Sequence, residues 1–470
     1  MTQEQFGTAN KHSESTQWQD THTVHFVGIG GMALSAIARI LLQRGFQVSG
    51  SDSQTSSYID DLRILGATIS EGHNALNVQN ADLVIYSAAI RMDNPEIIES
   101  KRLGIPIIRR SEAISALLSD KERSITVSGT HGKTTTTALI STILAKEGRN
   151  PSYLIGTKVP DLHGNARWGS GKDIVVEADE FDSAFLQYRP DVAVLTHLEA
   201  DHLDYFGSPD RIEHEFCEFV SNLDSESKII TRKGIPMLDR VVQSAKAQVI
   251  TYGTSGDWQL HWEGYNDGQS VFEIHPPSAP KRSVRLSLPG LHNAINAVAA
   301  IATCNNLGME IGNCIEHLAT FSGLERRFQI KSSTNGITIV DDYAHHPTEI
   351  METIRAAREL HQGRVWAVFQ PHLRSRTVDL FADFLTAFNY ADRVTITEIF
   401  SPQGRENTEP ITGAELAKAI DHRNCDFAQT IDEASELISQ EAEPGDLIVV
   451  MGAGDITNLT DKLIVWLAAV

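Results

Sequence analysis

The sequence predicts an α/β protein of three domains, each built around a mostly parallel β-sheet. With 470 residues the chain is too long for one hydrophobic core, so several domains are expected. Short apolar runs alternate with helical patterns along most of the chain, which is the order that produces parallel sheets. We place the domains at residues 21–120, 121–323 and 324–470, and we expect a disordered tail over residues 1–20.

The overall composition excludes several classes of protein. The chain carries 40 basic and 61 acidic residues, a formal net charge of −21, without a Lys/Arg cluster, so no nucleic-acid partner is expected. No apolar run approaches the roughly 18 residues that span a bilayer, and the polar N-terminus lacks the pattern of a signal peptide. The 4 cysteines are far apart and match no disulfide or metal spacing, which favours a cytoplasmic protein.

The first domain begins with a strand, a glycine turn and a helix. The strand Val24–Val27 leads into Gly28-Ile29-Gly30-Gly31-Met32-Ala33, and apolar residues then repeat at helical spacing as far as Leu42. A second strand ends at Asp52, about 20 residues further on. This G-x-G-x-x-A pattern with a later acid is typical of Rossmann-like nucleotide binding. It fits NAD(P) or another diphosphate-linked nucleotide, and a plain strand-to-helix turn is the alternative.

A second glycine turn opens the central domain. The β-rich run Ser124–Ser128 leads into Gly129-Thr130-His131-Gly132-Lys133-Thr134-Thr135, and a helix follows from Lys133 to Glu147. Backbone N–H groups at such a helix start face phosphate oxygens, the lysine adds a point charge, and a threonine hydroxyl can hold Mg²⁺. The usual consensus has a glycine where this chain has Val127. We interpret the turn as the nucleotide-phosphate loop, with an ordinary strand–turn–helix as the alternative.

Two further strands of the central domain end in polar groups. Ile174–Val176 leads into Glu177, and Val192–Thr196 leads into a segment that contains His197 and His202. Ligand groups gather at the carboxyl ends of parallel strands, so these side chains are placed to serve Mg²⁺ and a transferring phosphoryl group. Solvent-exposed loop residues are the alternative.

The remainder of the central domain contains an extension and a late helix. The polar stretch Asp257–Arg282 predicts antiparallel strands at the side of the domain. His292, Asn293 and Asn296 fall near the first turn of an Ala-rich helix. At that position they could cap the helix or face a ligand.

Strands of the C-terminal domain also end in polar clusters. Gly336–Val340 and Val365–Phe369 are each followed by a segment with histidines, and Asp446–Val450 is followed by a glycine turn. In a doubly wound sheet these segments meet at one edge. A single histidine there is usually a structural hydrogen-bonding group. The combination favours a site formed by Tyr343, His345, His346, His372 and Arg376.

Taken in order, these motifs resemble those of the Mur ligase family from about Thr23 to Asp455. Several are weak alone, but their joint order is highly specific. The matching segments are His25 to Gly31, Ser87 to Ile90 with Asp93 to Pro95, Gly129 to Thr137, Glu177 to Glu180, Glu199 to His202, His292-Asn293 with Asn296, Arg326 to Phe328, Asp342 to Pro347, Pro371-His372 with Arg376-Thr377, and Met451 to Asp455.

The resemblance implies a Rossmann-like N-terminal domain that binds UDP, a central P-loop ATPase domain with a mostly parallel sheet, and a Rossmann-like C-terminal domain that brings an amino acid. It also implies a role for each candidate residue. The sugar nucleotide would be bound by Gly28, Gly30, Gly31, His73, Ser87 and Arg110. ATP would be bound by Gly129, Thr130, His131, Gly132, Lys133, Thr134, Thr135, His292, Asn293, Asn296, Arg327 and Asp342. The amino acid would lie near Tyr343, His345, His372 and Arg376.

The implied activity is ATP-dependent amide-bond formation. L-alanine would be joined to the carboxylate of UDP-N-acetylmuramate through an acyl phosphate, in cytoplasmic synthesis of peptidoglycan precursors. ATP and Mg²⁺ are the implied cofactors, and a monomer or weak homodimer without membrane insertion is expected. The metal ligands would be Thr134, Glu177 and His202. The catalytic residues would be Lys133, Glu177, His202 and His345.

Other activities remain open at this point. A related ligase could join a preformed peptide to the same sugar nucleotide. An NAD-dependent oxidoreductase would use the first glycine turn but would leave Lys133, Glu177 and His202 without a role. A catalytically silent nucleotide-binding regulator would have no use for a complete set of phosphate and metal groups.

Three positions depart from the family pattern. Ala33 replaces a usual glycine, which the x-x-A form of the fingerprint tolerates. His197 stands beside the metal position where the family usually has Asn. Leu373 and Arg374 stand where an Arg-Tyr pair is often found, so recognition of the amino-acid carboxylate could have moved to Arg374, or the amino acid could differ.

Overall fold

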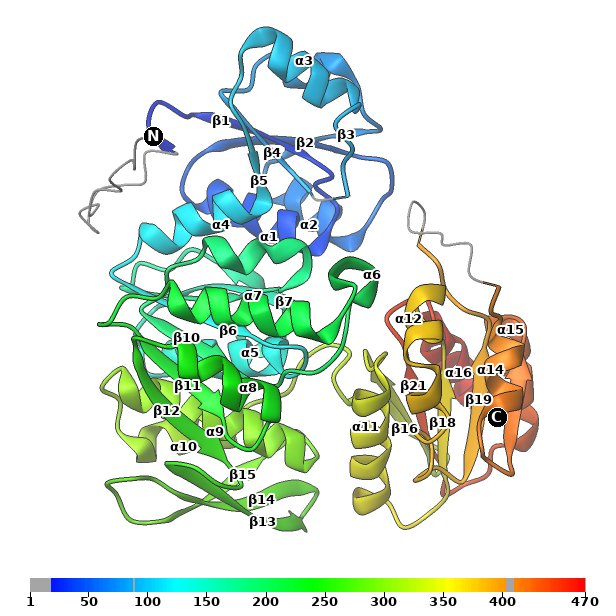
Figure 1. The fold of residues 1–470 in the computed structure, drawn as a ribbon. Helices are drawn as coiled ribbons and strands as arrows, with labels where there is room; N and C mark the ends of the chain where they lie inside the picture. The colour runs from blue at the N-terminus through cyan, green and yellow to red at the C-terminus, as the bar shows by residue number, and fades with distance from the viewer. Residues whose placement is uncertain (1–17, 88, 403–409, 470) are drawn as a thin grey trace.

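The computed structural model describes residues 18–87, 89–402 and 410–469. Within these ranges the chain forms three β-sheets of 5, 10 and 6 strands, with helices packed against them (Figure 1). The sheets are mainly parallel, so the predicted α/β class with three sheet-based units is confirmed. Most of the predicted N-terminal tail lies outside the described residues, and the predicted domain boundaries stay predictions.

The first sheet, at the top of Figure 1, is parallel throughout and has the order β3-β2-β1-β4-β5. Its central strand is almost wholly buried, as expected for a strand covered on both faces. The predicted strand–turn–helix around Gly28 is confirmed, because β1 ends at Val27 and α1 begins at Met32. The elements are β1 (Thr23–Val27), α1 (Met32–Gln43), β2 (Gln47–Asp52), α2 (Ser57–Ile64), β3 (Thr68–Glu71), β4 (Leu83–Tyr86), α3 (Pro95–Leu103), β5 (Ile107–Arg109) and α4 (Arg110–Ser119).

The second sheet has the order β15-β14-β13-β12-β11-β10-β6-β9-β7-β8. Its centre is parallel, and α5 and α9 pack side by side against it. The predicted antiparallel extension is confirmed in β13 to β15. The elements are β6 (Arg123–Ser128), α5 (Lys133–Lys146), β7 (Ser152–Val159), β8 (Gly164–Arg167), β9 (Asp173–Glu177), β10 (Val192–Leu195), α6 (Leu203–Phe206), α7 (Pro209–Ser221), β11 (Lys228–Arg232), α8 (Pro236–Val241), β12 (Gln248–Gly253), β13 (Trp258–Asn266), β14 (Gln269–His275), β15 (Arg282–Leu286), α9 (Leu291–Asn306) and α10 (Ile311–Ala319).

The third sheet, in yellow to red in Figure 1, has the order β16-β17-β21-β18-β19-β20, and only its edge strand β16 is antiparallel within the described ranges. Its inner strands β18 and β21 are buried at every residue, which explains their continuous apolar sequences. The elements are β16 (Gln329–Thr334), β17 (Ile337–Asp342), α11 (Pro347–Leu360), β18 (Val365–Phe369), α12 (Arg374–Asp379), α13 (Phe381–Phe384), β19 (Arg393–Thr397), α14 (Gly413–Ala419), β20 (Cys425–Ala428), α15 (Ile431–Glu441), β21 (Leu447–Met451) and α16 (Thr457–Ala469).

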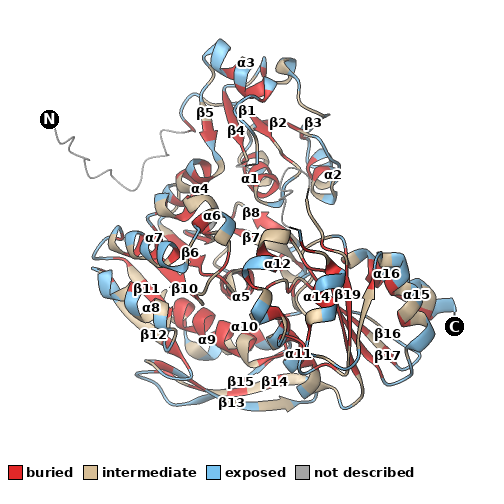
Figure 2. Cartoon of the chain, turned by 45° about the vertical axis from the view of Figure 1, so that its right-hand side comes forward, coloured by how far each residue is buried: buried red, intermediate tan, exposed pale blue. Residues whose placement is uncertain are grey.

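The apolar core joins the first two units and leaves the third with its own. One buried cluster extends from Ile37 of α1 through Leu154 and Ala166 of the β7–β8 hairpin to Ala193 of β10. The C-terminal unit has separate clusters on the two faces of its sheet. Figure 2 shows the inner strands of the sheets mainly in the colour of buried residues. Polar pairs described below, among them His131 with Glu349 and Arg376 with Asp201, link the C-terminal unit to the rest of the chain.

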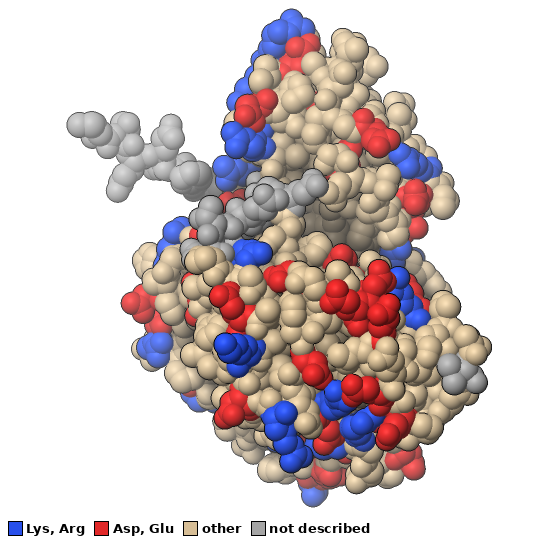
Figure 3. Space-filling model, turned by 90° about the vertical axis from the view of Figure 1, so that its right-hand side faces the viewer, with Lys and Arg blue, Asp and Glu red and all other residues tan. Residues whose placement is uncertain are grey.

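The outer surface carries both signs of charge. On the face drawn in Figure 3, Lys and Arg residues are interspersed with Asp and Glu residues. Among the described residues, no helix has the length and apolar character needed to cross a membrane.

Candidate active site

The phosphate loop connects β6 to α5, and its two glycines have backbone conformations that other residues rarely adopt. Gly129 has φ +132° and Gly132 has φ +82°. A Cβ atom on Gly129 would lie 2.5 Å from the carbonyl oxygen of His197, and one on Gly132 would lie 2.6 Å from Oδ1 of Asn296. Glycine is therefore required at both positions by conformation and by space. The loop is held to the segment after β10 by Thr130 N–H, which donates to His197 O at 2.7 Å.

Lys133 is the first residue of α5 and is directed back over the loop. Its Nζ donates to Gly129 O at 2.6 Å and to Glu180 Oε2 at 2.8 Å. Burial alone would lower the pKa of Lys133, but the carboxylates of Glu180 and Asp179 outweigh it and raise the pKa. The lysine is therefore a fixed positive charge beside the backbone N–H groups that begin α5.

Thr134 and Glu177 are brought together although 43 positions separate them. Thr134 Oγ1 donates to Glu177 Oε1 at 2.9 Å, and Gly156 N–H donates to Oε2 at 2.6 Å. Burial raises the pKa of Glu177, so its negative charge is incompletely compensated by the protein. A hydroxyl and a carboxylate are hard oxygen donors, and together they fit Mg²⁺.

His202 is the third residue expected to bind the metal. It precedes α6 with φ +50°, and its Nε2 is 3.8 Å from Asp201 Oδ2. It lines a small cavity together with Asp201 and Arg376, whereas Thr134 lines a different and larger one. The side chains of Thr134 and Glu177 are in direct contact, whereas His202 shares its cavity with Asp201 and Arg376.

The larger cavity, of about 250 Å³, lies between the central and C-terminal units. It brings together most of the residues expected to contact ATP, although they come from three distant parts of the sequence. Burial raises the pKa of Asp342 to about 6, while the N–H groups of Phe328 and Ala344 each donate to its carboxylate at 2.7 Å. The expected residues that line the cavity are His131, Gly132, Thr134, Thr135, His292, Asn293, Asn296, Arg327 and Asp342.

The start of α9 resolves one alternative that the sequence left open. The residue that caps the helix is Gly290, and no side chain forms a cap hydrogen bond there. Asn293 instead donates from Nδ2 to Pro289 O at 2.7 Å, and Asn296 approaches Gly132. His292, Asn293 and Asn296 are therefore not helix caps; all three face the cavity.

The four residues expected near the amino acid form one cluster. Arg376 donates from Nε to Asp201 Oδ1 at 3.1 Å, and its Nη1 is 3.3 Å from His372 Nδ1. The rings of His372 and His345 are 6.2 Å apart, and those of His345 and Tyr343 are 5.4 Å apart. Burial opposes the charge of Asp201, yet Arg376 holds the pKa of that carboxyl well below its usual range. The Arg376–Asp201 pair thus joins the C-terminal and central units.

His345 contributes a neutral imidazole to this cluster. Burial lowers the pKa of His345 to about 4. Its Nδ1 is 3.0 Å from the carbonyl oxygen of Tyr343, and a carbonyl only accepts, so Nδ1 carries the hydrogen. The other ring nitrogen, Nε2, is left as a hydrogen-bond acceptor or proton acceptor.

The depressed pKa of His345 predicts a contribution to acid sensitivity. The unfolded chain takes up a proton near pH 6.5, while the folded chain does so only near pH 4. This contribution to stability is complete above pH 6.5 and is lost as the pH falls towards 4. Between pH 7 and 4.5, the unfolding free energy of His345→Gln should fall less than that of the wild type, by about 2 kcal/mol. Urea unfolding of both proteins at several pH values measures this difference. An equal loss of unfolding free energy in the wild type and in His345→Gln would contradict the prediction.

The first glycine turn is held by its own sheet. Gly28 N–H donates to Ser51 O at 2.8 Å, and Gly30 N–H donates to Asp52 Oδ2 at 2.8 Å. A Cβ on Gly30 would lie 2.9 Å from that same oxygen. Asp52, the acid of the Rossmann-like pattern, therefore fixes the turn itself.

Other residues expected at the sugar-nucleotide end are more dispersed. Arg110 lines a second cavity of about 180 Å³, together with Ile90, whose side chain also lies beside Gly28. The Cβ of Ser87 is likewise next to the position where a Gly28 Cβ would stand. His73 is held by its Nδ1, which is 2.9 Å from Ser51 Oγ and 3.2 Å from the buried carboxylate of Glu96.

Two departures from the family pattern have distinct environments. His197 lines the larger cavity, where its Nδ1 is 3.2 Å from Arg232 Nη1, and burial lowers the pKa of His197 to about 4. Arg374 contacts the carbonyl of Ile411 and lies 4.0 Å from Glu398, so it is not part of the Arg376 cluster.

Several residues of the site were missed by the sequence analysis. Glu180 pairs with Lys133, Glu349 pairs with His131, and Arg232 and Glu352 line the larger cavity. Glu180 belongs to the acidic segment Glu177 to Glu180, which the sequence analysis included, but its pairing with Lys133 was not evident from the sequence. Glu349 is the third residue of α11, where its carboxylate accepts a hydrogen bond from the N–H of His346, so its local signal is that of a helix cap.

Comparison with known proteins gives matches along nearly the whole chain. The model of the Mur ligase family catalytic domain matches residues 23–122, that of the Mur ligase middle domain matches 127–304, and that of the Mur ligase glutamate ligase domain matches 326–454. A UDP-N-acetylmuramate–L-alanine ligase from Desulforamulus reducens is 39% identical, covering 94% of this chain and 97% of the relative. A UDP-N-acetylmuramate–L-alanine ligase from Chlorobaculum tepidum is 40% identical, covering 95% of this chain and 96% of the relative.

Solved structures show the same relationship. The UDP-N-acetylmuramate-alanine ligase of Thermotoga maritima superposes with a TM-score of 0.81 and 29% identity, covering 95% of this chain and 99% of that one. A murein peptide ligase from Psychrobacter arcticus gives a TM-score of 0.70 and 27% identity, covering 96% and 99%.

Proposed function

The chain belongs to the Mur ligase family, and we propose that it is the member that joins L-alanine to the carboxylate of UDP-N-acetylmuramate at the expense of ATP. Relatives named for this reaction match the chain over nearly their full length. The observation that carries the proposal is that one segment, the one after β10, contacts both the phosphate loop and the Arg376 cluster. The segment after β10 touches both, through Thr130 N–H on His197 O and through Asp201 on Arg376.

The reaction has two steps. A carboxylate oxygen of UDP-N-acetylmuramate attacks the γ-phosphorus of ATP, which forms an acyl phosphate and releases ADP. The neutral amine of L-alanine then attacks the acyl carbon, and phosphate leaves with the former carboxylate oxygen. Both steps bring negative charge together, so they need fixed cations and N–H dipoles around the reacting oxygens. Lys133 and the start of α5 supply these groups at the phosphate.

Mg²⁺ would be held by Thr134 and Glu177, with His202 as a further ligand on the amino-acid side. A bound Mg²⁺ supplies positive charge to the phosphate oxygens. Support comes from the buried Glu177 carboxylate, whose charge the surrounding groups only partly compensate. Arg327, Asp342, His292, Asn293 and Asn296 would surround the nucleotide in the larger cavity.

The amine would be received by the C-terminal cluster. The neutral imidazole of His345 has a free Nε2, which suits it to accept a proton from the attacking amine. Arg376 offers the amino-acid carboxylate a guanidinium already oriented by Asp201. The sugar nucleotide would approach from the opposite side, where Gly28, Gly30 and Gly31 face its diphosphate and Ser87 and Arg110 lie nearby.

Arg376→Lys is expected to raise the KM for L-alanine about tenfold or more, because lysine keeps the charge but loses the planar fork that pairs with a carboxylate. The KM for the sugar nucleotide should stay within about twofold. Initial rates at varied concentrations of each substrate measure this. Arg374→Lys is the matched control, because Arg374 contacts Ile411 and Glu398 instead. A larger rise in the KM for L-alanine in Arg374→Lys than in Arg376→Lys would contradict the assignment.

Isotope transfer tests the chemical path. UDP-N-acetylmuramate labelled with ¹⁸O in its carboxylate is incubated with the enzyme, Mg-ATP and L-alanine, and the released phosphate is examined by mass spectrometry. An acyl phosphate requires one labelled oxygen to appear in each phosphate. Unlabelled phosphate alongside normal product would rule out this path.

A ligase for a preformed peptide is the second candidate, because the murein peptide ligase of Psychrobacter arcticus shares the fold over nearly its full length. The L-alanine ligases match more closely, with the higher TM-score and with about 40% identity in the sequences. An NAD-dependent oxidoreductase has no support. The Asp52 carboxylate accepts a hydrogen bond from Gly30 N–H within the glycine turn, and the Lys133 loop is fully formed.

A further inference from the structure

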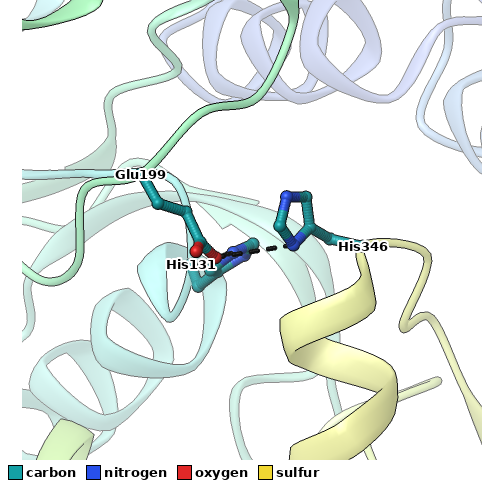
Figure 4. A group of neighbouring side chains, drawn as sticks. All are labelled: His131, Glu199 and His346. Carbon is teal, nitrogen blue, oxygen red and sulfur yellow. Dashed lines mark hydrogen bonds and ion pairs between the residues drawn. The ribbon is translucent and has the colours of Figure 1, made fainter. Parts of the chain in front are cut away.

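Two histidines and a glutamate meet at the junction of the central and C-terminal units (Figure 4). His131 comes from the phosphate loop, Glu199 from the segment after β10, and His346 from the residue before α11. Glu199 Oε1 is 2.5 Å from His131 Nε2 and 3.4 Å from His346 Nδ1. The three ligand atoms lie within 4.8 Å of one another.

The outward nitrogen of each imidazole is already engaged. His131 Nδ1 is 3.0 Å from the carboxylate of Glu349, and His346 Nε2 is 3.1 Å from the carbonyl oxygen of Ala200. Because these oxygens accept hydrogen bonds, both outward nitrogens carry hydrogens. His346 Nδ1 therefore has a lone pair, which also accepts a long hydrogen bond from Thr348 N–H at 3.3 Å. Metal-binding histidines typically show this arrangement, with the outer N–H on a carboxylate or a backbone carbonyl.

We propose that His131, Glu199 and His346 form a binding site for a divalent transition metal such as Zn²⁺, separate from the nucleotide-associated Mg²⁺. Imidazole nitrogens with one carboxylate are donors that Zn²⁺ prefers and Mg²⁺ does not. Two ligands about 2.05 Å from a tetrahedral ion are roughly 3.3 Å apart. The Glu199–His346 separation of 3.4 Å already matches this value.

Two adjustments are needed to admit an ion. His346 Nδ1 has one lone pair, so it must release the hydrogen bond from Thr348 N–H before it can bind a metal. The 2.5 Å contact between Glu199 and His131 must widen by about 0.8 Å to reach the spacing of two zinc ligands. Both side chains are partly exposed, so they have room to turn. The fourth position is left to a water molecule, as in zinc sites with three protein ligands.

A proton is the competing occupant of the same position. The carboxylates of Glu199 and Glu349 both contact the His131 ring, at 2.5 Å and 3.0 Å, so the site attracts a cation. A metal ion must displace the Nε2 proton in order to bind. The ligands come from the phosphate loop, from the segment after β10 and from the residue before α11, so a bound ion would fasten the C-terminal unit to the central unit.

Titration of the full-length protein with Zn²⁺ in the absence of nucleotide tests the proposal. Competition with a chromophoric chelator gives the affinity and the number of ions bound. Glu199→Gln keeps the shape of the side chain, and His346→Gln removes the imidazole that the C-terminal unit contributes; each should weaken binding at least about a hundredfold. Glu349→Gln removes an outer partner only and should weaken binding about 10- to 100-fold.

Two control variants separate this site from others. Glu177→Gln alters the proposed Mg²⁺ position and should leave the Zn²⁺ affinity within about threefold of the wild type. His275→Gln removes a surface histidine that pairs with Glu273 at 2.6 Å and should also leave it unchanged. Thermal unfolding of each variant establishes that it is folded.

Co²⁺ provides a second measurement. The visible spectrum of the wild type with Co²⁺ should show a four-coordinate site with nitrogen ligands, and the spectrum should be lost in folded Glu199→Gln. The proposal is overturned if Glu199→Gln and His346→Gln bind Zn²⁺ as the wild type does, or if Glu177→Gln alone abolishes binding. A proton would then be the only cation that the cluster holds. None of these outcomes depends on the ligase activity.

Discussion

Lys133→Ala is expected to reduce phosphate release by a factor on the order of a thousand or more. The Lys133 ammonium is the fixed charge over the phosphate loop, held at 2.6 Å from Gly129 O and 2.8 Å from Glu180. Alanine leaves the loop backbone in place but removes the charge that offsets the developing negative charge on the transferred phosphoryl group. A coupled assay for ADP with all three substrates present measures the change.

Stability must be separated from catalysis in this test. Removal of Lys133 leaves the Glu180 carboxylate buried without its cation, which is destabilising. The double variant Lys133→Ala/Glu180→Gln removes that charge as well, and it should recover thermal stability while remaining inactive. Lys172→Ala is the matched control, since Lys172 forms only an exposed pair with Glu122. Near-normal turnover in folded Lys133→Ala would refute the role of this lysine.

Glu177→Gln is expected to raise the Mg²⁺ concentration needed for half-maximal activity by about a hundredfold. Loss of an outer partner of a metal ligand already costs 10- to 100-fold in affinity, and Glu177 is proposed as a ligand itself. Glutamine keeps the size of the side chain, and its carbonyl oxygen can still accept from Thr134 or from Gly156. The charge is lost, and with it the attraction for a divalent cation. Activity measured across a Mg²⁺ titration at fixed ATP reports the change.

Glu213→Gln is the control for this substitution. Glu213 forms an ion pair with Arg240 on the surface of the central unit, where a single pair contributes little. Its Mg²⁺ titration should superimpose on that of the wild type. If the curve of Glu177→Gln also superimposed, the metal assignment of Glu177 and Thr134 would be wrong.

Local features of the site were readable from the sequence. The glycine turns at Gly28 and Gly129 each lie between a strand and a helix, because turn, strand and helix are encoded by neighbouring residues. The order of motifs along the chain then identified the family and the three sheet-based units. Buried strands such as β18 and β21 were recognisable because parallel strands covered on both faces are continuously apolar.

Contacts between distant segments were not readable in this way. His131 and Glu349 are 218 positions apart, and Arg376 and Asp201 are 175 apart. No local pattern encodes such pairs, because they depend on how the C-terminal unit rests against the phosphate loop. The role of His292, Asn293 and Asn296 could not be predicted for the same reason. At the first turn of a helix, a capping residue and a cavity-lining residue have the same sequence pattern, and only the fold distinguishes them.

A product assay tests the central claim most directly. The enzyme is incubated with Mg-ATP, UDP-N-acetylmuramate and one amino acid or one preformed peptide at a time, and the conjugate mass and released phosphate are measured together. L-alanine supplied alone should yield one equivalent of phosphate for each UDP-N-acetylmuramoyl-L-alanine formed. A conjugate that forms only with a preformed peptide would contradict the proposed function and would select the peptide ligase instead.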